Sequence, residues 1–186
     1  MRTFKLQVQT TVDGYMAGPN GEMDWMTFPW SDDLSAYAEG ISKSVDCIVL
    51  GRKLAEGFIP AWESQPEGED QASIDWMNNT PKVVVSNTLT ESPWQNAVVA
   101  GGDLVETITE LKSRPGGDLI AYGGGTFVAD LIANGLLDEL HLFVNPTAIG
   151  AGMPVFPAGA YAPLQRVNAT ATECGITVLH YAPKRP

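Results

Sequence analysis

The sequence is poor in positive charge and in cysteine. Its 186 residues include 11 Lys and Arg against 22 Asp and Glu, a formal net charge of −11. A general nucleic-acid-binding protein usually presents a basic face, so we expect no nucleic-acid partner. The two cysteines, Cys47 and Cys174, make neither a disulfide framework nor a zinc site, although a single bridge between them stays open.

Long apolar runs are also missing. No stretch is long enough to span a bilayer, and the first residues alternate apolar and polar side chains instead of forming the apolar block of a signal peptide. We therefore expect a cytoplasmic protein with no membrane partner. Its 44% hydrophobic content supports a sizeable core, and the length without a linker-like boundary predicts one domain over residues 1–186.

The motifs of two common kinds of site are absent. The two histidines, His141 and His180, lie in predicted strands, and no carboxylate cluster stands at ligand spacing, so we expect no metal site. No Gly-x-Ser-x-Gly elbow occurs, which leaves hydrolase chemistry without a nucleophile.

The hydrophobic pattern instead alternates between strands and helices. Strands are predicted at residues 3–12, 45–50, 82–86, 98–99, 119–122 and 138–144, and a closing hairpin at 164–173 and 175–182. Helices are predicted at 31–44, with Ser31 as its cap, and at 103–113 and after residue 125, with loops at 13–25 and 60–72. This order predicts an α/β fold with a mostly parallel central sheet flanked by helices and a C-terminal antiparallel hairpin.

The most informative segment joins an apolar strand to a helix through three glycines. Gly123, Gly124 and Gly125 let the chain turn sharply and let a ligand approach the backbone. Unpaired N–H groups at a helix start carry partial positive charge, which suits a phosphate or pyrophosphate. An ordinary glycine-rich turn is the alternative, because such patterns are weak without context.

Two other strand ends supply that context. Gly51-Arg52-Lys53 follows the strand at 45–50, and Ser86-Asn87-Thr88 follows the next strand. Ligands of open α/β sheets bind beyond the carboxyl ends of the strands. Although each segment alone also fits a polar loop, the three together predict a dinucleotide cradle in which Arg52 or Lys53 pairs with a phosphate.

Four motifs resemble the dihydrofolate reductase-like proteins. TVDGYMAGPNGEMDW resembles their flexible loop after the first strand, IVLGRKLAEGF their second strand and phosphate-gripping helix start, and KVVVSNTL their third strand and its turn. AYGGGTFVADLIANGLLDELHLFVNPTAIGAGMPVFP is similar to the RibD C-terminal domain, the reductase part of the bifunctional riboflavin-biosynthesis enzyme. The chain is thus identified as a stand-alone member of that family.

The resemblance implies a dihydrofolate reductase-like fold and an NADPH-dependent reductase of a small heterocyclic substrate, often a homodimer. The cofactor-binding positions that it implies are Met16 and Ala17 beside the nicotinamide, Gly51, Arg52 and Lys53 at a phosphate, Ser86, Asn87 and Thr88 near the adenosine ribose and its 2′-phosphate, and Gly123, Gly124, Gly125 and Thr126 at the pyrophosphate. The positions implied on the substrate side are Asp13, Asp24 and Trp25.

The chain departs from the family pattern at four positions. Tyr15 stands where a basic residue is usual and Tyr122 where a Glu precedes the glycines, which puts a phosphoribosyl-pyrimidine substrate in doubt. Leu54 replaces a common Thr and Asn87 a common Arg, which weakens the preference for NADPH over NADH.

Reduction of a C=N bond needs a proton at nitrogen as well as a hydride at carbon. In dihydrofolate reductases an acid on the first helix serves this purpose, and Asp32 and Asp33 lie near that position, with Asp33 preferred. A buried carboxylate there would have a raised pKa and could hold the proton. Asp13 is the other candidate for the proton donor. Each residue also has a purely structural explanation: Asp33 interacts with the helix dipole, and Asp13 forms the turn with the following glycine.

The best named activity by resemblance is 5-amino-6-(5-phosphoribosylamino)uracil reductase of riboflavin biosynthesis. Dihydrofolate reduction is the second enzymatic hypothesis. A protein that binds NADP without catalysis is the hypothesis from a different class.

Overall fold

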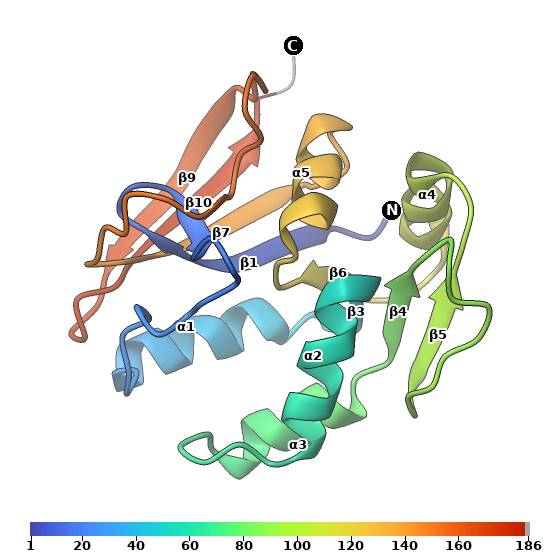
Figure 1. The fold of residues 1–186 in the computed structure, drawn as a ribbon, viewed down its shortest axis with the longest axis horizontal. Coiled ribbons are helices and arrows are strands. Elements are labelled where there is room, and N and C mark those ends of the chain that lie inside the picture. Colours follow the sequence, from blue (N-terminus) through green and yellow to red (C-terminus); the bar gives the residue numbers. More distant parts are fainter. Residues whose placement is uncertain (185–186) are drawn as a thin grey trace.

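The computed structural model describes residues 1–184, and its main feature is a large sheet with helices on both faces (Figure 1). The strands are β1 Phe4–Thr11, β2 Tyr15–Ala17, β3 Val45–Gly51, β4 Lys82–Val85, β5 Ala97–Ala100, β6 Asp118–Ala121, β7 Glu139–Asn145, β8 Met153–Pro154, β9 Leu164–Ala171 and β10 Thr177–Pro183. Eight of them form the sheet in the order β5-β4-β3-β6-β1-β7-β10-β9, and β2 pairs with β8.

The pairing confirms the predicted sheet. All neighbours from β5 to β7 are parallel, whereas β10 and β9 add an antiparallel hairpin at the edge. The order of strands and helices along the chain therefore gave the α/β class correctly, because parallel neighbours need a crossover between them.

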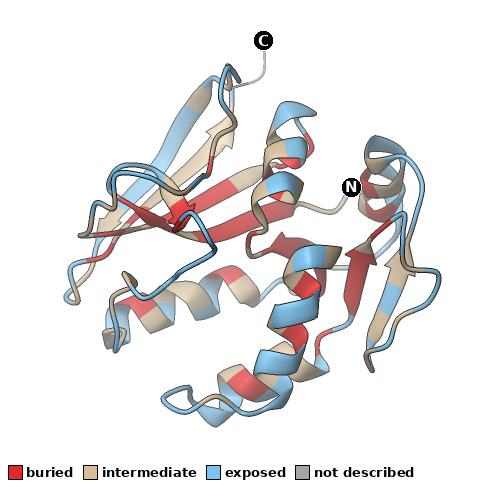
Figure 2. Cartoon of the chain, viewed as in Figure 1, coloured by how far each residue is buried: buried red, intermediate tan, exposed pale blue. Residues whose placement is uncertain are grey.

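The helices divide the buried residues into two cores. They are α1 Asp32–Ser42, α2 Arg52–Glu63, α3 Gln71–Asn79, α4 Leu104–Ser113 and α5 Gly125–Ala133. α4 and α5 pack on one face of the sheet, and α1, α2 and α3 pack on the other (Figure 1). In β3, Val49 belongs to the first core while Ile48 and Leu50 belong to the second, as expected of a strand covered on both faces. Figure 2 shows the resulting buried positions in the central strands.

Two predicted boundaries are wrong. The loop expected at 60–72 begins late, because α2 continues through Pro60 to Glu63. Proline removes one backbone donor, and the exposed Pro60 still accepts a hydrogen bond from Ser64 N at 3.0 Å. The loop expected at 13–25 also contains β2, which pairs with the distant β8, a contact that local sequence could not indicate.

The helix starts follow ordinary capping chemistry in two cases. The carboxylate of Asp70 accepts from Ser73 N and that of Asp103 accepts from Glu106 N. Ser31 occupies the predicted N-cap position of α1 but makes no side-chain cap hydrogen bond there. Both cysteines are free, and in residues 1–184 no helix combines the length and apolar character needed to cross a membrane.

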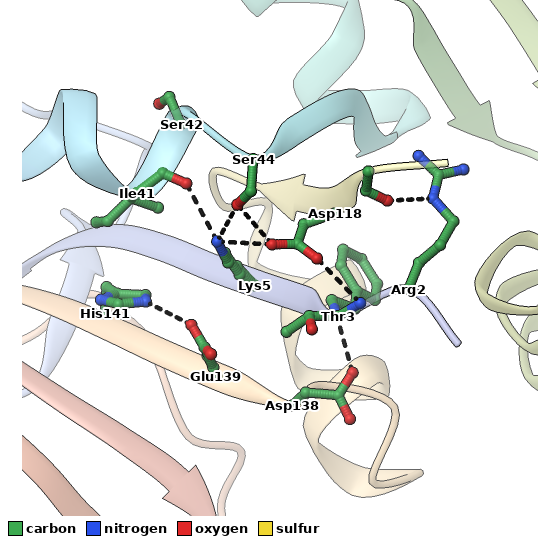
Figure 3. A network of polar contacts seen from close by, with 12 residues as sticks. Arg2, Thr3, Lys5, Ile41, Ser42, Ser44, Asp118, Asp138, Glu139 and His141 are labelled. Carbon is green, nitrogen blue, oxygen red and sulfur yellow. Dashed lines mark hydrogen bonds and ion pairs between the residues drawn. The ribbon is translucent and has the colours of Figure 1, made fainter. Parts of the chain in front are cut away.

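A polar network joins the amino-terminal ends of β1 and β6 to the turn after α1 (Figure 3). Asp118 accepts a hydrogen bond from Ser44 Oγ at 2.6 Å and pairs with Lys5 Nζ at 2.9 Å, and Lys5 also donates to Ile41 O at 3.2 Å. Burial acts to raise the pKa of Asp118, but the hydrogen bonds from Ser44 and Lys5 and the Lys5 charge lower it overall. The pair therefore neutralises a lysine that is 8% exposed.

We expect Asp118→Asn to lower the free energy of unfolding at neutral pH by about 2–4 kcal/mol, because it leaves the Lys5 charge buried without its partner. Urea denaturation measures the change. The matched control is Glu110→Gln, which breaks the exposed Arg114–Glu110 pair and should cost less than about 1 kcal/mol.

The same comparison has a pH dependence. Because the folded pKa of Asp118 is lowered, its contribution is present above the unfolded pKa of about 3.9 and is lost as the pH falls through the folded pKa. The stability difference between the wild type and Asp118→Asn should thus shrink below about pH 4. A difference that stays constant through that range would contradict the assignment.

Candidate functional site

The carboxyl ends of the parallel strands meet at one edge of the sheet. We call this edge the rim and define it as residues 51–53, 86–88, 101–103 and 122–126. Gly51 pairs with Val85 and Val85 with Ala100, so the ends of β3, β4 and β5 are level. The structure therefore brings the three predicted segments to one edge and adds a fourth, Gly101-Gly102-Asp103.

The triple-glycine bend has the backbone that only glycine adopts without strain. Gly123 has φ +145° and Gly124 has φ +91°. The first backbone hydrogen bond of α5 runs from Val128 N to Gly124 O at 2.8 Å, so the preceding N–H groups have no acceptor within the helix. These donors and the helix dipole are directed at the rim, where they suit an anion.

The starts of α2 and α5 touch each other at this bend. A Cβ added to Gly51, the N-cap of α2, would lie 2.8 Å from Phe127 Cβ, and one added to Gly124 would lie 3.5 Å from Leu54 Cβ. Glycine at 51 thus serves close packing between two helix starts, a structural reason that the sequence interpretation did not include. Two positive helix ends consequently lie side by side at the rim.

The two basic residues of the rim differ in their contacts. Arg52 Nη1 lies 2.6 Å from Glu56 Oε1, one turn along α2, and its side chain is 34% exposed. Lys53 is exposed. Because exposed pairs of this kind contribute little stability, the Arg52 guanidinium can exchange Glu56 for a phosphate at small cost.

The segment after β4 is held by its own side chains. The buried Ser86 Oγ accepts from Thr88 N at 3.2 Å and from Leu89 N at 3.1 Å. Asn87 Oδ1 accepts from Gly102 N at 2.7 Å, and its Nδ2 donates to Gly102 O at 3.2 Å. Ser86 and Asn87 therefore shape the rim, whereas Thr88 is exposed beside it.

Sequence reasoning missed the Gly101-Gly102 turn. The sequence does contain a signal for this turn. An apolar strand is followed by two glycines and then by the amphipathic helix α4, which is the same order as at the triple-glycine bend. Gly102 has φ +104°, and a Cβ on Gly101 would lie 3.2 Å from Ser86 O.

The loop after β1 is fixed by Asp13 and by β2. Asp13 accepts hydrogen bonds from Gly150 N at 2.7 Å and Ile149 N at 3.2 Å. Hydrogen bonding from the Thr11 side chain and from Gly150 N lowers the pKa of this exposed carboxyl. Asp13 thus joins the loop after β1 to the loop at residues 149–150 through hydrogen bonds, and its carboxylate is ionised at neutral pH.

The two positions predicted beside the nicotinamide lie in β2. Met16 and Ala17 are 5% and 7% exposed, and Ala17 pairs with Met153. A Cβ on Gly152 would lie 2.2 Å from Ala17 O, so the two backbones approach closely. Met153 Sδ would in turn lie 3.6 Å from a Cβ on Gly125, which places β8 between β2 and the bend.

Asp33 lacks the buried surroundings that would raise its pKa. Asp33 is exposed and accepts hydrogen bonds from Ser31 Oγ at 2.5 Å, Leu34 N at 2.9 Å and Glu173 N at 3.1 Å. The Ser31 hydroxyl is the main cause that lowers the pKa of Asp33, where a buried acid would have it raised. The sequence could not show this, because Glu173 lies in the distant hairpin turn.

The two remaining substrate-side positions lie in the segment before α1. Asp24 is exposed, and Trp25 is half-buried with its Nε1 donating to Glu22 O at 3.1 Å. The fully buried Asn145, missed by the sequence interpretation, anchors this segment at the end of β7 by accepting from Thr27 N at 2.8 Å.

A surface hollow lies at the opposite end of β4. Its lining residues are Ile59, Glu63, Asn78, Asn79, Lys82, Gln95 and Asn96. Lys82 Nζ there already donates to Thr80 O at 2.9 Å and Asn78 O at 3.4 Å. The rim is the better candidate, because its helix N–H groups lack helical acceptors.

Comparison with known proteins identifies a family over almost the whole chain. The sequence profile described as the RibD C-terminal domain matches residues 2–178. The Bacillus subtilis (strain 168) protein YyaP is 32% identical over 160 residues, which cover 83% of this chain and 80% of YyaP.

Solved structures share the fold. A putative riboflavin biosynthesis protein from Shewanella sp. PV-4 matches over the whole of both chains with a TM-score of 0.78 and 22% identity. Dihydrofolate reductase from Enterococcus faecalis, complexed with NADP(H), matches 98% of this chain and 97% of its own with a TM-score of 0.66 and 17% identity. These matches confirm the predicted dihydrofolate reductase-like fold.

We expect Gly51→Ala to destabilise the protein by about 1–3 kcal/mol, because its methyl group would press on Phe127 at the junction of the two helix starts. Gly57→Ala is the matched control on the same helix, since a Cβ at Gly57 meets no atom within 4 Å. This control should leave stability unchanged or raise it by up to about 1 kcal/mol through helix propensity. Thermal or urea unfolding measures both, and equal effects would contradict the packing role of Gly51.

Proposed function

Because the chain belongs to the RibD C-terminal domain family, we propose that it is an NADPH-dependent reductase of a small planar heterocycle. The observation that carries this proposal is the junction of two helix starts with the triple-glycine bend at the rim. Backbone N–H groups of this kind bind a diphosphate without needing many basic side chains, which suits a chain of net charge −11.

The rim residues fit the cofactor. Gly123, Gly124, Gly125 and Thr126 would bind its pyrophosphate through backbone donors and the Thr126 hydroxyl. Arg52 and Lys53, just after Gly51, would bind a phosphate. Asn87 is fixed on Gly102, so of the segment after β4 the exposed Thr88 is the better placed to meet the ribose. When bound, the nicotinamide supplies the hydride, and the protein's part is to orient it and exclude water.

The protein must also manage a proton. Asp33 and Asp13 are both exposed with lowered pKa values, so both are ionised at neutral pH. For either to donate a proton, the substrate must cover it and raise its pKa by desolvation. Asp24 and Trp25 stay predicted substrate contacts.

The proposed substrate is a pyrimidine or a pterin. The best named reaction is reduction of 5-amino-6-(5-phosphoribosylamino)uracil. A Thermotoga maritima enzyme of similar fold carries this reductase activity in its name. The two structures match with a TM-score of 0.71 and 15% identity, and the match covers 57% of that enzyme's chain. Tyr15 and Tyr122 in place of charged residues argue for a substrate with less charge than this one. There are two alternatives to this reaction. One is dihydrofolate reduction, and the other is NADP binding without catalysis.

A titration followed by a turnover assay tests the proposal. NADPH fluorescence should change on binding, and cofactor oxidation should follow when an aminouracil or a dihydropterin is added. Binding without oxidation across a broad panel of heterocycles would favour the non-catalytic alternative. Absence of binding to both NADPH and NADH would overturn the proposal.

The predicted cytoplasmic location and homodimer belong to the same proposal. Among residues 1–184, the outer strand β9 pairs on one side only and is mostly exposed, with Val167 55% exposed, so a second copy has a strand to pair with. Sedimentation equilibrium measures the assembly state.

We expect Arg52→Ala to weaken NADPH binding by about ten- to a hundredfold, because a charge-assisted hydrogen bond to phosphate contributes about 1.5–3 kcal/mol. NADH should lose less if the lost partner is the 2′-phosphate. Arg114→Ala is the matched control, since Arg114 forms the same kind of exposed helical pair, 2.7 Å from Glu110, away from the rim. Equal losses for NADPH and NADH would place Arg52 at the pyrophosphate.

A further inference from the structure

The chain contains two histidines, and the fold places them in contact. His141 of β7 and His180 of β10 are direct cross-strand partners. Their rings stack with centroids 4.1 Å apart and planes inclined by 22°. Directly paired residues project from the same face of a sheet, so both imidazoles lie on the face that α1 covers.

A carboxylate completes the group. Glu139 precedes His141 by two residues and therefore shares its face of β7. Its Oε2 lies 3.2 Å from His141 Nε2 and 3.6 Å from His180 Nε2 (the Glu139–His141 contact is drawn in Figure 3). The sequence interpretation found no carboxylate cluster at ligand spacing and expected no metal site, but tertiary pairing brings His180 to the Glu139-x-His141 strand and so gathers one carboxylate with both histidines.

The two carboxylate-to-imidazole distances are close to the spacing of ligand atoms around a small transition-metal ion. Because the stacked rings hold their Nε2 lone pairs nearly parallel, both rings must turn about their Cβ–Cγ bonds to direct these lone pairs at one ion. Zinc binds nitrogen and oxygen ligands at about 2.0–2.2 Å, so two ligand atoms of a tetrahedral site lie about 3.3 Å apart. The ligand atoms of Glu139, His141 and His180 all lie within 4.8 Å of one another. We propose that these three residues bind a divalent transition-metal ion, such as Zn²⁺, and leave a fourth position for water.

An unpaired buried nitrogen supports the proposal independently. His180 Nε2 is buried and has no hydrogen-bond partner in the described part of the chain. Buried polar atoms are normally satisfied, so this nitrogen points to a missing partner. A metal ion held between it and Glu139 would supply that partner.

The surroundings of His141 fit a ligand. The Tyr37 hydroxyl lies 3.1 Å from His141 Nδ1, so the other nitrogen, Nε2, faces Glu139. A hydrogen bond at the second ring nitrogen is the usual way in which a metal-bound histidine is oriented. The nearby Lys5 is paired with Asp118, which reduces its repulsion of a cation.

The site is separate from the rim. Glu139 and His141 lie in the first half of β7, whereas Asn145 ends that strand at the carboxyl edge. The Glu139 side chain is 33% exposed, so an ion from solvent can reach the three ligand atoms. Metal binding here does not rest on the proposed reductase function.

Isothermal titration with ZnCl₂ tests the site on tag-free, EDTA-treated protein, because both of the chain's histidines belong to it. We expect one ion per chain, a higher melting temperature with Zn²⁺, and Co²⁺ absorption typical of nitrogen and oxygen ligands. His180→Gln and Glu139→Gln should each weaken Zn²⁺ binding by about tenfold or more. The half-buried positions of these two residues favour folded variants, which circular dichroism verifies.

Cys174→Ser is the control, since it removes the partly exposed thiol and should leave Zn²⁺ binding unchanged. Two results would overturn the proposal. One is the absence of saturable Zn²⁺ binding, which would make the cluster a hydrogen-bonded support for the β7–β10 pairing. The other is unchanged affinity in both His180→Gln and Glu139→Gln, which would place the ion elsewhere.

Discussion

The close approach of α5 to the end of β3 is the contact on which the rest of the rim depends. It is possible because Gly51 has no side chain where Phe127 packs, and it sets the start of α5 beside the start of α2. Two helix ends that each carry unpaired donors then face the same space. A side chain at 51 would push the helices apart and spread these donors, so one packing contact controls both the local stability and the electrostatics of the rim.

The two ends of the sheet are built on different polar chemistry. At the carboxyl edge, backbone N–H groups and positive-φ glycines dominate, and the charged side chains Arg52 and Lys53 remain accessible. At the other edge, charged side chains form ion pairs with one another, as Lys5 does with Asp118, and these pairs hold neighbouring strands together. With this division, the positive potential at the carboxyl edge of a strongly acidic chain comes from helix ends more than from basic residues, which is what the proposed cofactor site requires.

Asp33 and Asp13 illustrate how tertiary contacts change the role of a residue. Asp33 was the preferred candidate for the proton donor and Asp13 its rival, and each accepts a backbone N–H group from a distant segment. Such bonds stabilise the charged carboxylate, which is the opposite of what a stored proton requires. In this structure they fasten loops, and a catalytic role for either depends on what the substrate does to its surroundings.

The sequence by itself determined the α/β class, the parallel order of strands and helices, and the three segments at the rim, because hydrophobic periodicity and glycine turns are local properties. The motif resemblance further gave the family. Only the tertiary structure decided the pairing of β2 with β8, the packing reason for Gly51, and the meeting of Glu139, His141 and His180 across two strands. Those features depend on residues far apart in the chain, and no local pattern records which distant backbone or side chain will become a neighbour.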